Sequence, residues 1–171
     1  NPSGGGGIYA TGSTTLIDTT IAGNSTGQYR TAGGGLKGGT VTIDNSTISG
    51  NRTEGEYSPG GGLYASNLTL TGSAIVDNMT LGRRSDGGGL QAGFAEVSLS
   101  TFSGNSAQGG SKGGGLSIAN GTVSGVTVSG NFAAQSGGLF QYEGFVENSI
   151  VLGNASNTFR NDFVYGYSPT I

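Results

Sequence analysis

The sequence has no cysteine, no histidine and no tryptophan, and only 10% of its 171 residues are charged. The absence of cysteine excludes a disulfide scaffold. The formal net charge of −3 and the lack of a basic stripe argue against a nucleic-acid partner, because phosphates bind clustered Lys and Arg side chains. No run approaches 18 apolar residues, so we expect no membrane span.

Glycine is abundant instead, with 37 residues, and its runs mark an internal repeat. The aliphatic residues that end these runs follow one another at intervals of 28, 27, 27, 26 and 23 residues. A second motif, aliphatic-x-x-Asn, recurs at intervals of 27, 27, 27, 26 and 23 residues. Two motifs that keep a nearly constant separation indicate about six coils of about 27 residues. The aliphatic residues are Ile8, Leu36, Leu63, Leu90, Leu116 and Leu139.

Apolar residues occupy fixed places within each repeat. The positions three and eight residues before the asparagine are apolar in every coil. The alternation in Val41-Thr42-Ile43 is typical of a strand with one buried face. The sequence therefore predicts an all-β fold, a single-stranded parallel β-helix (β-solenoid) over residues 1–154, followed by a tail at 155–171. A leucine-rich repeat has a similar period, but the Gly, Ser and Thr between the motifs disfavour its helix.

The asparagine of the second motif has a structural explanation. The residue before it is glycine in five coils, which suits a bend with positive φ, and Asp77 takes this place in the third coil. Stacked asparagines can exchange side-chain amide hydrogen bonds with the copies above and below. We therefore predict a structural ladder, rather than a ligand site, at Asn24, Asn51, Asn78, Asn105, Asn131 and Asn154.

Two stretches carry a family resemblance. Phe102-Ser103-Gly104-Asn105 resembles the Phe-x-x-Asn repeat of chlamydial polymorphic outer-membrane proteins. Thr47-Ile48-Ser49-Gly50-Asn51 is similar to the coils of bacterial secreted right-handed β-helix proteins. The resemblance covers residues 4 to about 154. It implies a right-handed β-helix in an extracellular or cell-surface protein with a structural or adhesive role.

Other functions have weaker support in the sequence, which predicts no enzyme, no cofactor and no metal site. A β-helix that cleaves polysaccharides needs clustered carboxylates, but Asp18 and Asp44 have no third acid in register, and Glu96 is one strand away. Glycan binding or processing is the main alternative, since the loops after each asparagine vary in sequence. Ice binding is less favoured and would use a column of threonines: Thr20, Thr47, Thr101 and Thr127.

The remaining predictions concern contacts with other molecules. Asn45, Asn67 and Asn120 begin sequons outside the ladder and are candidate glycosylation sites. The first coil begins within four residues of Asn1, so we expect its strand edges to be uncapped. The tail is expected to cap the last coil or to serve as an inter-subunit strand, and either head-to-tail self-association or a longer surface protein would follow. Its apolar residues are Phe159, Phe163, Val164, Tyr165 and Tyr167.

Overall fold

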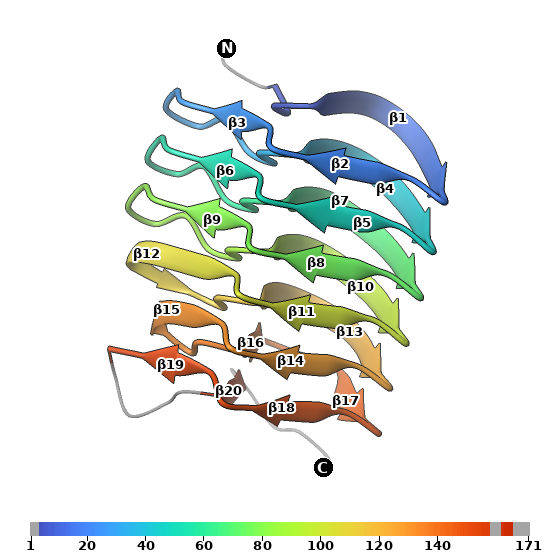
Figure 1. Cartoon of the computed structure of the whole chain (residues 1–171), viewed down its shortest axis with the longest axis vertical. Coiled ribbons are helices and arrows are strands. Elements are labelled where there is room, and N and C mark those ends of the chain that lie inside the picture. The colour runs from blue at the N-terminus through green and yellow to red at the C-terminus, as the bar shows by residue number, and fades with distance from the viewer. Residues whose placement is uncertain (1–3, 158–161, 166–171) are drawn as a thin grey trace.

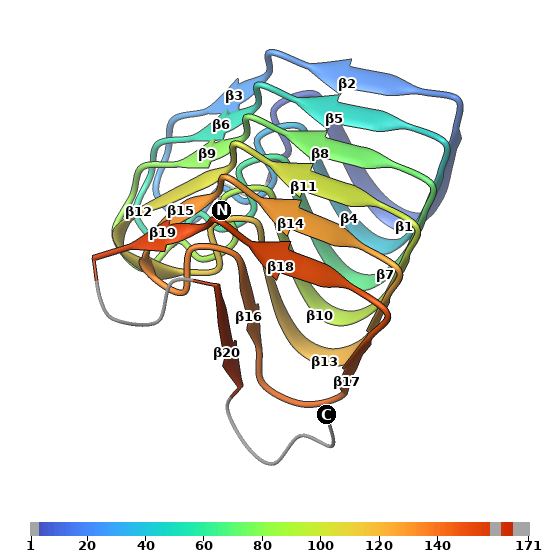
Figure 2. The same ribbon diagram turned by 60° about the horizontal axis from the view of Figure 1, so that its bottom comes forward.

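The computed structural model of the chain describes residues 4–157 and 162–165. Within these ranges every regular element is a strand, and no helix occurs. The coils stack along one axis, so that their strands form three parallel sheets, and each coil contributes strands to all three sheets (Figures 1 and 2). The predicted all-β parallel solenoid of about six coils is therefore confirmed, and the absence of helix from the described residues speaks against a leucine-rich repeat.

The three sheets are named by the order in which the chain enters them. The first sheet contains β1 (Ile8–Ile17), β4 (Leu36–Asp44), β7 (Leu63–Thr71), β10 (Leu90–Ser98), β13 (Leu116–Ser124), β16 (Leu139–Gln141), β17 (Phe145–Glu147) and β20 (Phe163–Tyr165). The second contains β2 (Thr20–Ala22), β5 (Thr47–Ser49), β8 (Ala74–Val76), β11 (Thr101–Ser103), β14 (Thr127–Ser129) and β18 (Ile150–Leu152). The third contains β3 (Ser25–Thr26), β6 (Arg52–Thr53), β9 (Met79–Thr80), β12 (Ser106–Lys112), β15 (Phe132–Gln135) and β19 (Ala155–Ser156).

Equivalent residues of successive coils pair directly, so the core is a set of apolar columns. In the second sheet Ile48 pairs with Ile75, and Ile75 pairs with Phe102, whose side chain is fully buried. In the first sheet the leucines that follow the glycine runs are all buried, from Leu36 to Leu139. Each buried aliphatic contributes about 1.5–3 kcal/mol relative to exposure. The columns predicted from the sequence form one continuous core.

Positive φ marks the bend before each asparagine. Gly50 has φ 61°, Gly104 has φ 64°, and Asp77 adopts φ 54° at the equivalent place, as predicted. The second glycine of each run has a different requirement. A Cβ on Gly61 would lie 2.3 Å from the carbonyl oxygen of Gly88 and 2.5 Å from the backbone of Met79, so the chain can pass this close to β9 only without a side chain.

The asparagines make a continuous hydrogen-bonded ladder along the axis. Asn51 Nδ2 donates to Asn78 Oδ1 over 3.0 Å, and Asn78 Nδ2 donates to Asn105 Oδ1 over 3.1 Å. Each of these oxygens also accepts the backbone N–H of the preceding asparagine, at 3.0 Å in both cases. The ladder ends at Asp162, whose Oδ1 accepts from Asn154 Nδ2 over 3.0 Å. Asn51, Asn78 and Asn105 are fully buried, so these bonds satisfy polar groups that water cannot reach.

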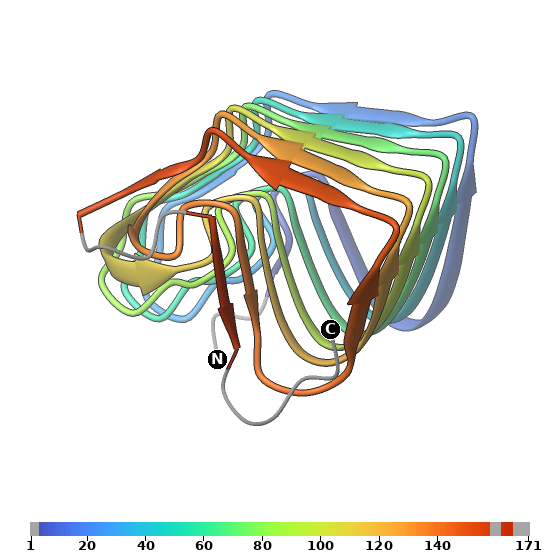
Figure 3. The ribbon, with the colours of Figure 1, turned by 90° about the horizontal axis from the view of Figure 1, so that it is seen from below.

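The segments that follow β3, β6 and β9, together with the far end of β12, project from the coil as a stack that we call the lobe, residues 27–33, 54–60, 81–87 and 108–113 (Figure 3). In the last three of these segments a buried serine accepts the backbone N–H of the equivalent residue in the coil before it, and Thr31 stands at this place in the first. Ser58 N donates to Ser85 Oγ over 2.9 Å, and Ser85 N donates to Ser111 Oγ over 3.0 Å. These bonds join each segment of the lobe to the equivalent segment of the next coil.

Asn78→Ala is expected to destabilise the chain strongly, because it removes an acceptor of two buried N–H groups and a donor to Ile48 O and Asn105 Oδ1. Each buried group left unpaired costs about 1–3 kcal/mol. Urea denaturation followed by circular dichroism measures the loss. Asn67→Ala is the matched control, because Asn67 is exposed on β7, and the change should be within about 0.5 kcal/mol. Equal losses in the two variants would contradict a structural ladder.

Candidate functional site

The candidate site lies on the outer face of the first sheet, where the sheet meets the lobe. The second residue of each strand points away from the buried leucine before it, and these residues pair from coil to coil. The column that results consists of Tyr9, Lys37, Tyr64, Gln91, Ser117 and Phe140. Large side chains therefore flank two smaller ones.

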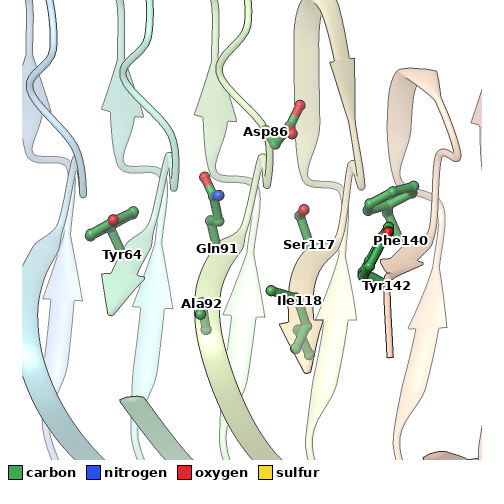
Figure 4. A pocket seen from close by; sticks show the side chains of 10 residues that line it. Tyr64, Asp86, Gln91, Ala92, Ser117, Ile118, Phe140 and Tyr142 are labelled. Carbon is green, nitrogen blue, oxygen red and sulfur yellow. The ribbon is translucent and has the colours of Figure 1, made fainter. Parts of the chain in front are cut away.

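A hollow of about 300 Å³ opens at the two smaller members of this column (Figure 4). Gln91 and Ser117 form its floor together with the small residues Gly93 and Ala119. The aromatic rings of Tyr64 and Phe140 lie at its two ends, with Tyr142 beside Phe140, and Asp86 reaches it from the lobe. Tyr64 and Phe140 are three coil steps apart, which at the strand spacing corresponds to roughly 14 Å along the axis.

Backbone contacts fix the aromatic end of the hollow. Tyr142 N donates to Ile118 O over 3.1 Å, and Gln141 Nε2 donates to Gly121 O over 2.9 Å. Gln141 is fully buried, whereas Tyr142 is 47% exposed. The turn therefore holds Tyr142 on the coil surface with much of its side chain open to a ligand.

Asp86 supplies a carboxyl group to the wall of the hollow. Its Oδ1 accepts the backbone N–H of Lys112 over 2.8 Å. Burial raises the pKa of Asp86 above its ordinary value of 3.8, while the hydrogen bond from Lys112 and the Lys112 charge act in the opposite direction. The carboxyl group therefore accepts a proton more readily than an exposed aspartate and can exchange hydrogen bonds with a hydroxyl.

The side chain of Gln91 lines the floor of the hollow, but its Oε1 is closed to solvent and has no donor among residues 4–157 and 162–165. A ligand in the hollow therefore meets other polar groups, of which the Asp86 carboxyl is one. This carboxyl gives the hollow a polar wall between two aromatic ends.

Two further hollows do not combine aromatic rings at both ends with polar groups between them. One of about 240 Å³ lies on the lobe among Glu56, Tyr57, Arg83 and Arg84, and there the Arg84 guanidinium donates to the Tyr57 hydroxyl. The other, of about 380 Å³, follows the Thr and Ser columns of the first sheet beside Glu96. The described residues contain no group of three acids or other side chains that could hold a metal ion.

The acids considered for catalysis lie apart from the hollow. Asn45 Nδ2 donates to Asp18 Oδ1 over 2.5 Å at the corner between the first and second sheets. Asp44 pairs with Ile17 and Thr71, and Glu96 pairs with Thr69 and Thr122. The structure therefore does not gather these acids around one point.

The structure also places the candidate glycosylation sites, the threonine column and part of the tail. Asn67 and Asn120 are exposed on β7 and β13, and Asn120 Nδ2 donates to Glu143 Oε2 over 3.2 Å. The threonine column runs along the second sheet and is interrupted at Ala74. In the tail, Phe163, Val164 and Tyr165 form β20, which pairs with β16, while Phe159 and Tyr167 lie outside the described residues.

Comparison with known proteins gives no relative for this chain. No protein-family model, no curated protein and no solved structure matches it. The described residues also contain no helix long and apolar enough to cross a membrane. Any inference about the function of the chain therefore rests on the fold and on the hollow.

Asp86→Asn tests the burial of this carboxyl group. Because burial raises its pKa, folding favours the protonated form, so the contribution of Asp86 to stability is largest below pH 3.8 and falls as the pH rises through the raised pKa. Asparagine keeps an acceptor for Lys112 N and has no charge to bury. The stability of the variant relative to the native chain should therefore increase between about pH 4 and pH 7. Urea denaturation at several pH values measures this, and a difference that is constant or decreases would contradict the account.

Proposed function

We propose that the chain is an extracellular or cell-surface adhesive module that binds a glycan in the hollow between Tyr64 and Phe140. The observation that carries the proposal is the combination of the half-buried Tyr64 and Phe140 rings, the exposed Tyr142 and the Asp86 carboxyl on one face of the coil. Sugar rings present C–H groups that pack on aromatic faces and hydroxyls that donate to oxygens such as those of the Asp86 carboxyl. The motif resemblance described above implies the same surface location.

The scaffold suits adhesion because hydrogen bonds join its coils along the axis. Successive coils are joined by strand pairing in three sheets and by the asparagine ladder, so the rings at the two ends of the hollow are held at a fixed separation. A preformed site loses less conformational entropy when a long ligand binds. This arrangement supports the binding of a ligand rather than its chemical conversion.

Phe140→Ala and Tyr64→Ala test the proposal. The native chain is first screened on an array of neutral and acidic glycans, and the dissociation constant for the best binder is then measured by titration calorimetry. Each variant should bind at least about 10-fold more weakly, which corresponds to about 1.4 kcal/mol of lost contact.

Phe145→Ala is the matched control for Phe140→Ala. Phe145 belongs to the same coil, is 55% exposed on β17 and does not line the hollow. Its removal should leave the dissociation constant within about two-fold, and circular dichroism should show all three variants folded. Failure of the native chain to bind any glycan, or equal binding by Phe140→Ala and Phe145→Ala, would rule out the hollow as the site.

A further inference from the structure

Positive charge is confined to one side of the coil. Among the described residues, every lysine and arginine lies on the lobe, on the third sheet or in the column beside the hollow, whereas the second sheet, its corners and the far half of the first sheet carry acids and no cation. The cations are Arg30, Lys37, Arg52, Arg83, Arg84 and Lys112. The acids of the opposite side are Asp18, Asp44, Asp77, Glu96 and Glu147. A chain of net negative charge therefore presents its positive side where the hollow lies.

A lysine accompanies the aromatic ring at each end of the hollow. Lys37 Nζ lies 6.0 Å from the centroid of the Tyr64 ring, and Lys112 Nζ lies 4.5 Å from the centroid of the Phe140 ring. Neither ammonium group has a carboxylate oxygen within 4.0 Å among the residues that the structure describes. Lys37 Nζ also lies 5.7 Å from the centroid of the Tyr9 ring, and the Lys112 charge also acts on Asp86. Both ammonium groups thus lie beside an aromatic ring, without an ion pair among the described residues, and can contact an anion.

We propose that the ligand of the hollow is an acidic polysaccharide that lies parallel to the coil axis, with carboxylate or sulfate groups reaching Lys37 at one end and Lys112 at the other. This inference rests on the proposed function and names the ligand class. Sugar rings pack on Tyr64 and on Phe140, and the hydroxyls between them meet Gln91 and Asp86. The anionic groups that bind are separated by about three coil steps, roughly 14 Å.

The centre of the hollow favours a sugar acid over a nucleic acid. The Asp86 carboxyl is an acceptor, so it attracts hydroxyl groups and disfavours a phosphate placed between the two lysines. Nucleic acids carry a dense, regular row of charges that proteins meet with many cations. Here the two cations at the hollow match a ligand with a few anionic groups spread along a hydroxyl-rich chain.

The test compares a hexasaccharide of galacturonic acid with a neutral glucan hexasaccharide by titration calorimetry. The native chain should bind the acidic hexasaccharide at least about 10-fold more tightly at low salt, and added salt should reduce this preference because it screens exposed charges. Lys37→Gln and Lys112→Gln should each weaken binding of the acidic ligand by about 5- to 10-fold. Neither change should alter binding of the neutral ligand by more than about two-fold.

Arg52→Gln is the control for loss of one positive charge. Arg52 is exposed on β6 and already paired with Glu54, so its replacement should leave the preference unchanged. Equal binding of the two hexasaccharides, lysine variants that bind like the native chain, or tighter binding of single-stranded DNA would overturn the acidic-glycan inference while leaving the hollow as a glycan site. Binding of no saccharide at all would instead remove the proposed function.

Discussion

The structure depends on one interaction, the hydrogen bond from a backbone N–H of one coil to a side-chain oxygen of the next. Strand pairing satisfies the backbone along the flat walls, but at a bend the chain turns away from its neighbour and its amide loses that partner. Asparagine supplies the missing oxygen at one bend, where Asn51 N donates to Asn78 Oδ1 over 3.0 Å. Serine supplies it at the other two, where Ser46 N donates to Ser73 Oγ over 3.0 Å and Ser58 N donates to Ser85 Oγ over 2.9 Å.

These bends keep the coils in register, and the register produces the functional surface. Since each residue lies over its equivalent in the next coil, equivalent side chains form a column along the axis. Smaller side chains within such a column leave a recess in the surface. In the column that begins at Tyr9, this recess lies at Gln91 and Ser117, between the rings of Tyr64 and Phe140. A ligand site thus arises from two residues that differ from their neighbours above and below.

Much of the fold could be predicted from the sequence because its determinants repeat at a fixed interval. Apolar residues three and eight places before the asparagine indicate the core, and they are buried or pack against it. The serine ladders escaped prediction because Ser and Thr are common throughout the chain and three equivalent serines do not stand out. Asp162 escaped because it lies outside the repeat, although its carboxylate accepts from both nitrogens of Asn154.

The hollow could not be predicted for a different reason. Asp86 and Lys112 belong to the lobe, whereas Gln91 and Phe140 belong to strands of the first sheet, and only the fold brings the two groups together. The separation of positive and negative charge between two sides of the coil also could not be predicted, because it too depends on the fold. The six cations among the described residues are spread from Arg30 to Lys112 and form no basic run, yet the coil places them on one side. Leu99 adopts φ 49° because it stands at the corner after the first sheet, where its equivalents Asn45 and Gly125 also have positive φ.

The most direct test of the account is a map of the ligand contact on the chain in solution. Backbone amide chemical shifts are recorded by nuclear magnetic resonance while a galacturonic acid hexasaccharide is added. The account predicts that the largest changes follow the axis along one column, at Tyr64, Gln91, Ser117 and Phe140, with the adjacent Asp86 and Lys112. Changes centred instead on the second sheet or on the outer tip of the lobe would contradict it.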